Sequence, residues 1–153
     1  MSGWYNKVKA DTANIVDAIS FYEKELENAR KETYISGLLE KNSREIPGIV
    51  AYRFSQLQEI EAILEYLNIE ARSVLHKHYR KYLEHYNKVL SSRDADKFAE
   101  GEQEYIDMKN IVNEFALVRN KYLALMKGLE AKQFQIGHIA KLRAAGLEDI
   151  HLD

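Results

Sequence analysis

Tyrosines and cations alternate in one stretch near the middle of the chain, and this mixture could bind nucleic acid. Tyr79, Tyr82 and Tyr86 are spaced by three and four residues, so they share one face of a helix. Arg80 and Lys81 lie beside them. Cations can meet phosphates and aromatic rings can stack on unpaired bases, which predicts single-strand binding without sequence readout. The alternative is that the tyrosines continue a core stripe beside an ordinary solvated face.

Charge is segregated along the chain, although the net charge of its 153 residues is only -2. Residues 72–93 hold six Lys or Arg against one Glu, and residues 119–143 hold the same excess. Residues 94–114 reverse the sign, and we expect them either to repel DNA or to dock a basic partner. Solvated faces tend to mix signs, so the first basic block favours a DNA site. The predicted DNA contacts are Arg72, Lys77, Tyr79, Arg80, Lys81, Lys88 and Arg93.

The side chains that could hold a metal ion are poorly spaced for that purpose. Ligands on one helix face must be three or four residues apart, but His76 and His78 are two apart and His78 and His85 are seven apart. The chain has no cysteine, no HExxH, no Walker A loop, no GxGxxG and no GxSxG. We therefore expect no metal, no cofactor and a protein that is not an enzyme.

The spacing of apolar residues predicts an all-α fold in which long helices position these side chains. Two series step by three and four residues, as in coiled coils: Leu57, Ile60, Leu64, Leu67, Ala71 and Val74, then Met108, Ile111, Phe115, Val118, Tyr122, Leu125 and Leu129. We expect the two series to face each other in a long antiparallel hairpin, closed by one tight turn near residues 91–96. Ser91 or Ser92 can cap the helix that follows. A third amphipathic helix is marked by Ile15, Ile19, Tyr22, Leu26 and Ala29.

Breakers divide this single expected domain into three parts. Residues 42–48 contain the only proline, and Pro47 can be the first residue of a new helix. The prediction is an N-terminal helix in residues 1–45, the hairpin in 46–132, and a short assembly helix with a tail in 133–153. Gly146 is expected to end that last helix, and the residues after it to form the tail.

An elongated hairpin leaves apolar residues outside its seam in contact with water, which favours self-association. Ile63, Tyr66, Leu123 and Leu147 are such residues. The alternative is a monomeric three-helix bundle in which the first helix folds back over them. No apolar tract is long enough to span a membrane, the start has no secretory pattern, and the lack of cysteine fits a reducing cytosol. We expect a cytoplasmic location.

Three segments, in their order and spacing, resemble the UvsY family of phage recombination mediators. They are Tyr82-Leu83-Glu84-His85-Tyr86, the stretch from Ser91 to Phe98, and Phe134-Gln135-Ile136-Gly137-His138-Ile139 with Arg143-Ala144. The resemblance runs roughly from Ile49 to Gly146. It implies a small helical protein that forms ring-shaped homo-oligomers and binds single-stranded DNA. It also implies that the protein weakens the hold of single-strand-binding protein and loads a RecA-like recombinase in the host cytoplasm.

The resemblance also assigns roles to particular residues. The family's DNA-contacting basic pair corresponds to Arg80 and Lys81, while Tyr82 replaces an expected charge. The family's self-assembly region corresponds to the C-terminal segment, where the apolar contacts would be Phe134, Ile136, Ile139 and Leu142. Residues 1–45 have no counterpart. The competing hypothesis is a helical structural or adaptor protein that acts through protein–protein contacts only.

Overall fold

The computed structural model describes residues 3–86 and 88–147, and within this part of the chain every regular element is helical. The predicted all-α class is confirmed. Two short 3-10 turns, Thr12–Asn14 and Lys31–Thr33, flank the second helix. The five α-helices are α1 (Trp4–Ala10), α2 (Ile15–Arg30), α3 (Leu39–His85), α4 (Ser92–Glu100) and α5 (Gln103–Ala144).

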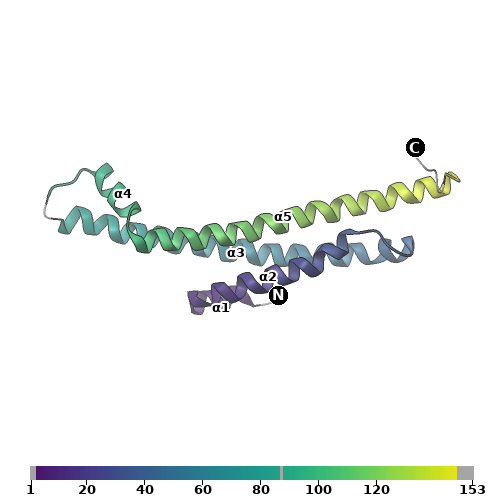
Figure 1. The fold of residues 1–153 in the computed structure, drawn as a ribbon, viewed down its shortest axis with the longest axis horizontal. Helices are drawn as coiled ribbons and strands as arrows, with labels where there is room; N and C mark the ends of the chain where they lie inside the picture. The colour runs from purple at the N-terminus through teal and green to yellow at the C-terminus, as the bar shows by residue number, and fades with distance from the viewer. Residues whose placement is uncertain (1–2, 87, 148–153) are drawn as a thin grey trace.

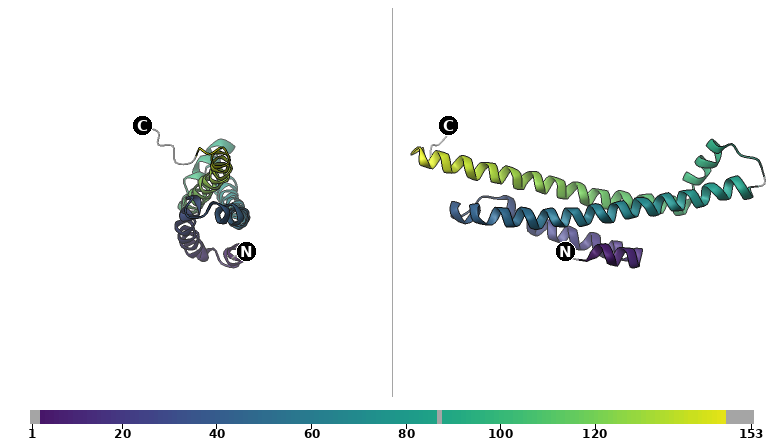
Figure 2. Two further views of the ribbon diagram at one scale, coloured as in Figure 1. Left: turned by 90° about the vertical axis from the view of Figure 1, so that its right-hand side faces the viewer. Right: turned by 180° about the vertical axis from the view of Figure 1, so that it is seen from behind.

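α3 and α5 form an elongated trunk, in which they lie side by side and run in opposite directions (Figures 1 and 2). At 1.5 Å per residue, their 47 and 42 residues extend about 70 and 63 Å. Their buried seams share one hydrophobic core, because residues spaced by three and four point to the same side of each helix. The core members from the seams are Leu57, Ile60, Leu64, Leu67, Ala71, Phe115, Val118, Tyr122, Leu125 and Leu129.

α1 and α2 fold back along one side of the trunk, α1 against α3 and α2 against α5 (Figure 2). α2 buries the face that its spacing predicts, with Ile15, Tyr22, Leu26 and Ala29 in the core. In this arrangement Ile63 is fully buried and Tyr66 is half-buried. Leu123 and Leu147 remain exposed, so the N-terminal helices cover only part of the surface that the hairpin alone would leave wet.

The helix boundary expected at residue 46 is wrong, because α3 begins at Leu39 and contains Pro47. A proline removes one backbone hydrogen bond, here to the carbonyl of Ser43. Both residues are exposed, so water can replace that bond. The start of the helix is instead fixed from the loop before it, where the Asn42 side-chain amide donates to the carbonyls of Ser36 and Leu38.

The C-terminal segment is not a separate short helix, because α5 continues without interruption to Ala144. Leu129, Lys132 and Ile136 keep the three-and-four spacing of its buried face. As predicted, Gly146 stops the helix as its C′ residue: its φ is +70°, and the N–H groups of Gly146 and Leu147 donate to the carbonyls of Arg143 and Leu142 in a Schellman motif. The tail expected beyond this point lies, from residue 148, outside the described residues.

The connection between the two long helices contains α4 rather than one tight turn. Ser91 caps α4, and its hydroxyl accepts from the Asp94 backbone N–H at 3.2 Å, as the sequence predicts. Ala95 and Ala99 of α4 are fully buried, and α4 packs mainly on α3. This packing places α4 at one end of the molecule, beside the last turns of α3 (Figure 1).

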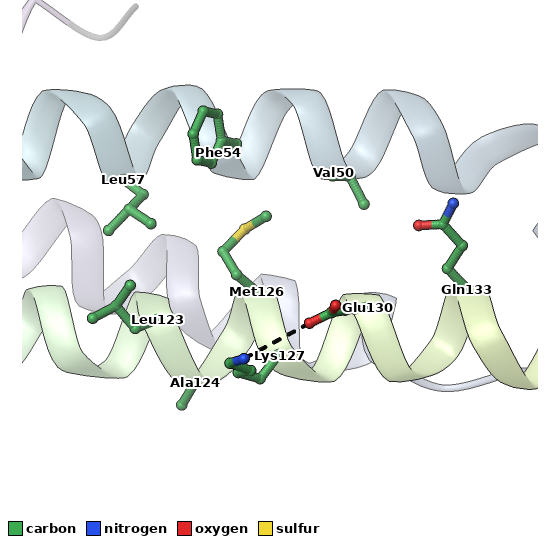
Figure 3. Close-up of a pocket in the computed structure, with 9 residues that line it drawn as sticks. All are labelled: Val50, Phe54, Leu57, Leu123, Ala124, Met126, Lys127, Glu130 and Gln133. Carbon is green, nitrogen blue, oxygen red and sulfur yellow. Dashed lines mark ion pairs between the residues drawn. The ribbon is translucent and has the colours of Figure 1, made fainter.

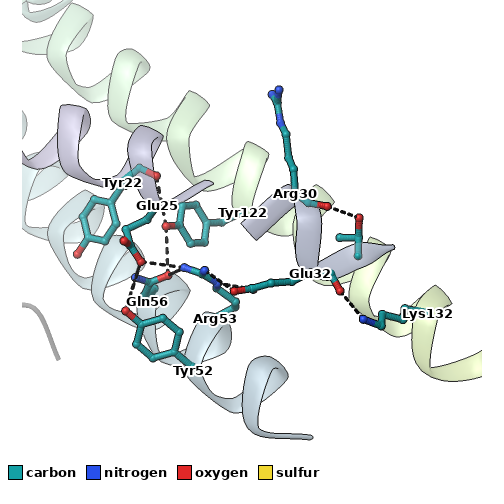
Figure 4. A network of polar contacts seen from close by, with 10 residues as sticks. Tyr22, Glu25, Arg30, Glu32, Tyr52, Arg53, Gln56, Tyr122 and Lys132 are labelled. Carbon is teal, nitrogen blue, oxygen red and sulfur yellow. Dashed lines mark hydrogen bonds and ion pairs between the residues drawn. The ribbon is translucent and has the colours of Figure 1, made fainter. Parts of the chain in front are cut away.

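A buried polar network joins α2, α3 and α5 (Figure 4). Arg53 is only 4% exposed; it donates two hydrogen bonds to Glu32, at 2.8 and 2.7 Å, and one to Glu25 at 2.9 Å. The Gln56 amide also donates to Glu25, and this bond is the main reason why the pKa of Glu25 is lowered. Tyr122 of α5 completes the network by donating to Gln56. Because the buried charge is fully paired, the network fixes the three helices in register.

Candidate nucleic-acid interface at the tip

Three aromatic rings cluster where α4 packs on the end of α3, a region that we call the tip. Tyr82 stacks on Phe98 with ring centroids 5.3 Å apart, and Tyr86 lies 5.5 Å from Tyr82 and 6.0 Å from Phe98. Tyr86 and Phe98 are 46% and 47% exposed. A half-exposed ring can pack on protein through one part and still offer surface to an unpaired base.

The predicted DNA-contacting residues lie along the second half of α3 and around the tip, but they do not form one uniform cationic face. Lys88 and Arg93 are exposed in the linker and in the first turn of α4. Arg80 is paired with Glu84 on the same helix, at 3.5 Å, and Arg72 with Glu65, at 3.3 Å. Tyr79 is half-buried and makes no ring contact with the cluster.

The remaining two cations contact Glu102, the residue before α5, and Glu104 in its first turn. The Lys77 ammonium donates to both carboxylate oxygens of Glu104, at 3.1 and 2.9 Å. The Lys81 ammonium lies 3.7 Å from Glu102, and Tyr82 donates its hydroxyl proton to the same carboxylate. The acidic stretch thus folds against the basic block of its own chain, an arrangement that neither sequence-based alternative included.

Hydrogen bonds hold both glutamates in their charged form. The Tyr82 hydroxyl is the main cause of the lowered pKa of Glu102, and Lys77 is the main cause of the lowered pKa of Glu104. The same hydrogen bond raises the pKa of Tyr82. Buried between these groups is His78, whose Nε2 lies 2.7 Å from Glu104. Among the described residues, its Nδ1 is the one buried side-chain nitrogen or oxygen without a hydrogen-bond partner.

Three residues of this site, Phe98, Glu102 and Glu104, could have been found only in part from the sequence. Phe98 was not predicted as a contact, although it belongs to the segment that resembles the recombination mediators and follows a helix cap by seven residues. The contact of Glu102 and Glu104 with α3 depends on the position of α4. That position sets which residues of α5 lie opposite Lys77 and Lys81.

The four predicted assembly residues differ in their accessibility. Phe134 is 72% exposed and stacks on His138, with centroids 6.5 Å apart. Leu142 is exposed and Ile139 is half-buried. Ile136 is only 6% exposed and belongs to the hydrophobic core of its own chain. Of the four predicted residues, only Phe134, Ile139 and Leu142 are therefore accessible for an apolar contact with another chain.

A second apolar surface lies between α3 and α5, where sequence reasoning identified only the exposed Leu123 (Figure 3). This groove encloses about 570 Å³. Half-exposed Phe54 and Leu123 lie on its two sides, and an ion pair between Lys127 and Glu130, 3.9 Å long, lies on its α5 side. The groove residues are Val50, Phe54, Leu57, Leu123, Ala124, Met126, Lys127, Glu130 and Gln133.

The residues that the structure describes contain neither a metal site nor a membrane-spanning helix. No group of three or more His, Asp or Glu side chains there could hold a metal ion. No described helix is both long enough and apolar enough to cross a membrane. Comparison with known proteins adds nothing further, since no family model, no curated protein and no solved structure matches the chain.

Proposed function

We propose that this protein is a non-enzymatic recombination mediator that binds single-stranded DNA at the tip. The observation that carries the proposal is the ring cluster in which half-exposed Tyr86 and Phe98 pack with half-buried Tyr82, with cationic side chains on α3 and α4 around it. Rings that stack on bases and cations that contact phosphates are the two components of single-strand binding without sequence readout. The resemblance to the UvsY family points to the same part of the chain.

In the proposed function the protein acts as a homo-oligomer, which the resemblance implies is a ring. One tip offers few phosphate contacts, but linked copies make each later contact intramolecular and raise avidity by about 10²–10⁴-fold. Exposed Phe134 and Leu142 and the apolar groove are the surfaces that support assembly. In this role the oligomer weakens the hold of single-strand-binding protein on DNA and loads a RecA-like recombinase in the host cytoplasm.

Salt-dependent binding to oligothymidine tests the DNA site. Arg80→Ala with Lys81→Ala should lower the affinity and also the slope of affinity against salt. With fewer phosphate contacts, binding releases fewer counterions from the DNA. The matched control is Lys41→Ala with Arg44→Ala, which removes two exposed, ion-paired cations from the opposite end of α3. Equal losses in both double variants, or none in the first, would remove the tip as the DNA site.

Light scattering tests the assembly. The wild-type mass should exceed that of one 17.8 kDa chain, and Phe134→Asp should lower it because a charge cannot be buried in an apolar contact without a partner. Because Phe134 is largely exposed, the variant should keep the helical content of the wild type. A wild-type mass of one chain at micromolar concentration contradicts the assembly.

An adaptor that acts only through protein contacts is the second candidate. The observation that favours it is the groove between α3 and α5, since apolar grooves on helical proteins commonly accept a partner helix. The two candidates make different predictions in filter binding. Strong assembly without retention of oligonucleotide at low salt favours the adaptor.

A further inference from the structure

The strongest observation outside the proposed binding mode is that two cations of the DNA site on α3 have anionic partners from another element, the start of the α5 segment. Lys77 and Lys81 are 64% and 60% exposed, so both can reach a phosphate, yet their ammonium groups lie against Glu104 and Glu102. A carboxylate and a phosphate oxygen compete for the same ammonium donors. The start of α5 therefore occupies positions that DNA phosphates would take.

The placement of Glu102 is not explained by a role in capping its own helix. It is the residue before α5, where a side chain could accept from the free N–H groups of the first turn, but it makes no such hydrogen bond. Its carboxylate is directed to α3 instead, where Tyr82 and Lys81 contact it. The carboxylates of both glutamates thus contact α3, and both contacts join α3 to the start of α5.

The strength of these contacts suits exchange rather than permanent closure. Ion pairs that water can reach contribute little to stability, because water solvates the separated charges well. A tethered carboxylate nevertheless acts at a local concentration in the millimolar range, so it competes effectively with a weakly bound phosphate. Several phosphates arriving on one strand would outcompete it, whereas an isolated anion would not.

We propose that Glu102 and Glu104 form an acidic latch that occupies Lys77 and Lys81 until single-stranded DNA displaces it. This inference rests on the proposed DNA-binding function of the tip. The latch raises the threshold for binding, so that short or isolated anions are excluded while a long strand engages the full set of cations. Opening would also free the first turn of α5, which lies next to Gly101 at the α4–α5 junction.

The test compares two double variants that change net charge equally. Glu102→Gln with Glu104→Gln removes the latch charges and should raise affinity for oligothymidine about fivefold at 0.1 M salt, the amount expected from releasing one exposed and one partly exposed pair. The control, Asp96→Asn with Glu100→Gln, neutralises two nearby exposed acids for which the described structure gives no ion pair with α3. Its affinity should rise by less than about half as much, because only the general field changes.

Different failures of this experiment have different meanings. If wild type binds and the latch variant binds no more tightly than the control variant, the latch is wrong and the proposed function stands. If none of the three proteins binds at low salt, the proposed function fails, and the latch with it. A latch variant that does not fold is replaced by hydrogen exchange on the wild type. Oligothymidine should then speed amide exchange in residues 102–106, and unchanged or slower exchange there would overturn the latch.

Discussion

The trunk and the tip both contain cations bonded to glutamates, but they use these pairs in opposite ways. In the trunk, Arg53 is 4% exposed and every bond is made within a packed network of three helices. At the tip, Lys77 and Glu104 are 64% and 49% exposed in their side chains, and either can exchange its partner for water or another ion. Burial thus turns one ion pair into a fixed structural element and leaves the other available for a ligand.

The chemistry of the two cations fits this division. The guanidinium of Arg53 has several donors in a fixed plane, so it can bond Glu25, Glu32 and Gln56 together. Its pKa is raised, chiefly by the hydrogen bond to Glu32, so it stays charged inside the protein. An ammonium on a flexible chain, such as that of Lys77, instead follows whichever anion is nearest.

The largest expected effect breaks the trunk network. Arg53→Met removes a buried cation and strands two carboxylates, so the free energy of unfolding should fall by about 3 kcal/mol. Urea denaturation followed by circular dichroism measures the change. The matched control is Arg72→Met, which breaks an exposed pair with Glu65 and should cost less than about 1 kcal/mol. Similar losses in both variants would show that burial does not separate the two kinds of pair.

A smaller effect is expected from removing a ring at the tip. Tyr86→Ala deletes a half-exposed ring and should weaken binding to oligothymidine by about 1–3 kcal/mol, the contribution of one base stacked on an aromatic side chain. Fluorescence anisotropy with a labelled oligonucleotide measures it. The control is Tyr52→Ala in the trunk, another exposed tyrosine, which should leave affinity unchanged. Loss of binding with Tyr52→Ala alone would move the site to the trunk.

The smallest effect is in the titration of the tip. The pKa values of Glu102 and Glu104 are lowered below the ordinary value of 4.5, so their contacts with α3 are complete above that pH. As the pH falls through the lowered pKa values, protonation weakens the bonds to Lys77, Lys81, His78 and Tyr82. Carbon-13 NMR of the side-chain carboxyls should give midpoints below 4.5 for both glutamates. Midpoints at or above 4.5 would mean that the contacts do not form in solution.

Local sequence patterns predicted the helices well. They predicted the contacts between segments distant in the chain poorly. The spacing of Tyr22 and Leu26 in α2, like that of Ile60 and Leu64 in α3, identifies buried faces because a helix repeats every 3.6 residues. Pro47 led to a wrong predicted start for α3. The cost of a proline inside a helix depends on whether water reaches the carbonyl four residues earlier, and only the fold decides that. The Arg53 network was missed because its members are far apart in the chain: Glu32 and Glu25 lie 21 and 28 residues from Arg53, and Tyr122 lies 66 residues from Gln56.

The candidate site was predictable to a similar extent. The sequence indicated the cations and tyrosines at the end of α3, because they are neighbours on one helix. It did not indicate that α4 would place Phe98 on Tyr82, or that Glu104 would reach Lys77. Both contacts depend on how the chain reverses direction after residue 86, and no spacing rule determines that geometry.

Ultraviolet cross-linking of bromodeoxyuridine-containing oligonucleotide, followed by mass spectrometry, tests most directly whether the tip is the DNA site. Aromatic side chains in contact with the modified base capture it, so the attached residues report the path of the strand. The account predicts cross-links in the peptides that contain Tyr82, Tyr86 and Phe98. Cross-links confined to α1, α2 or the groove between α3 and α5 would contradict it.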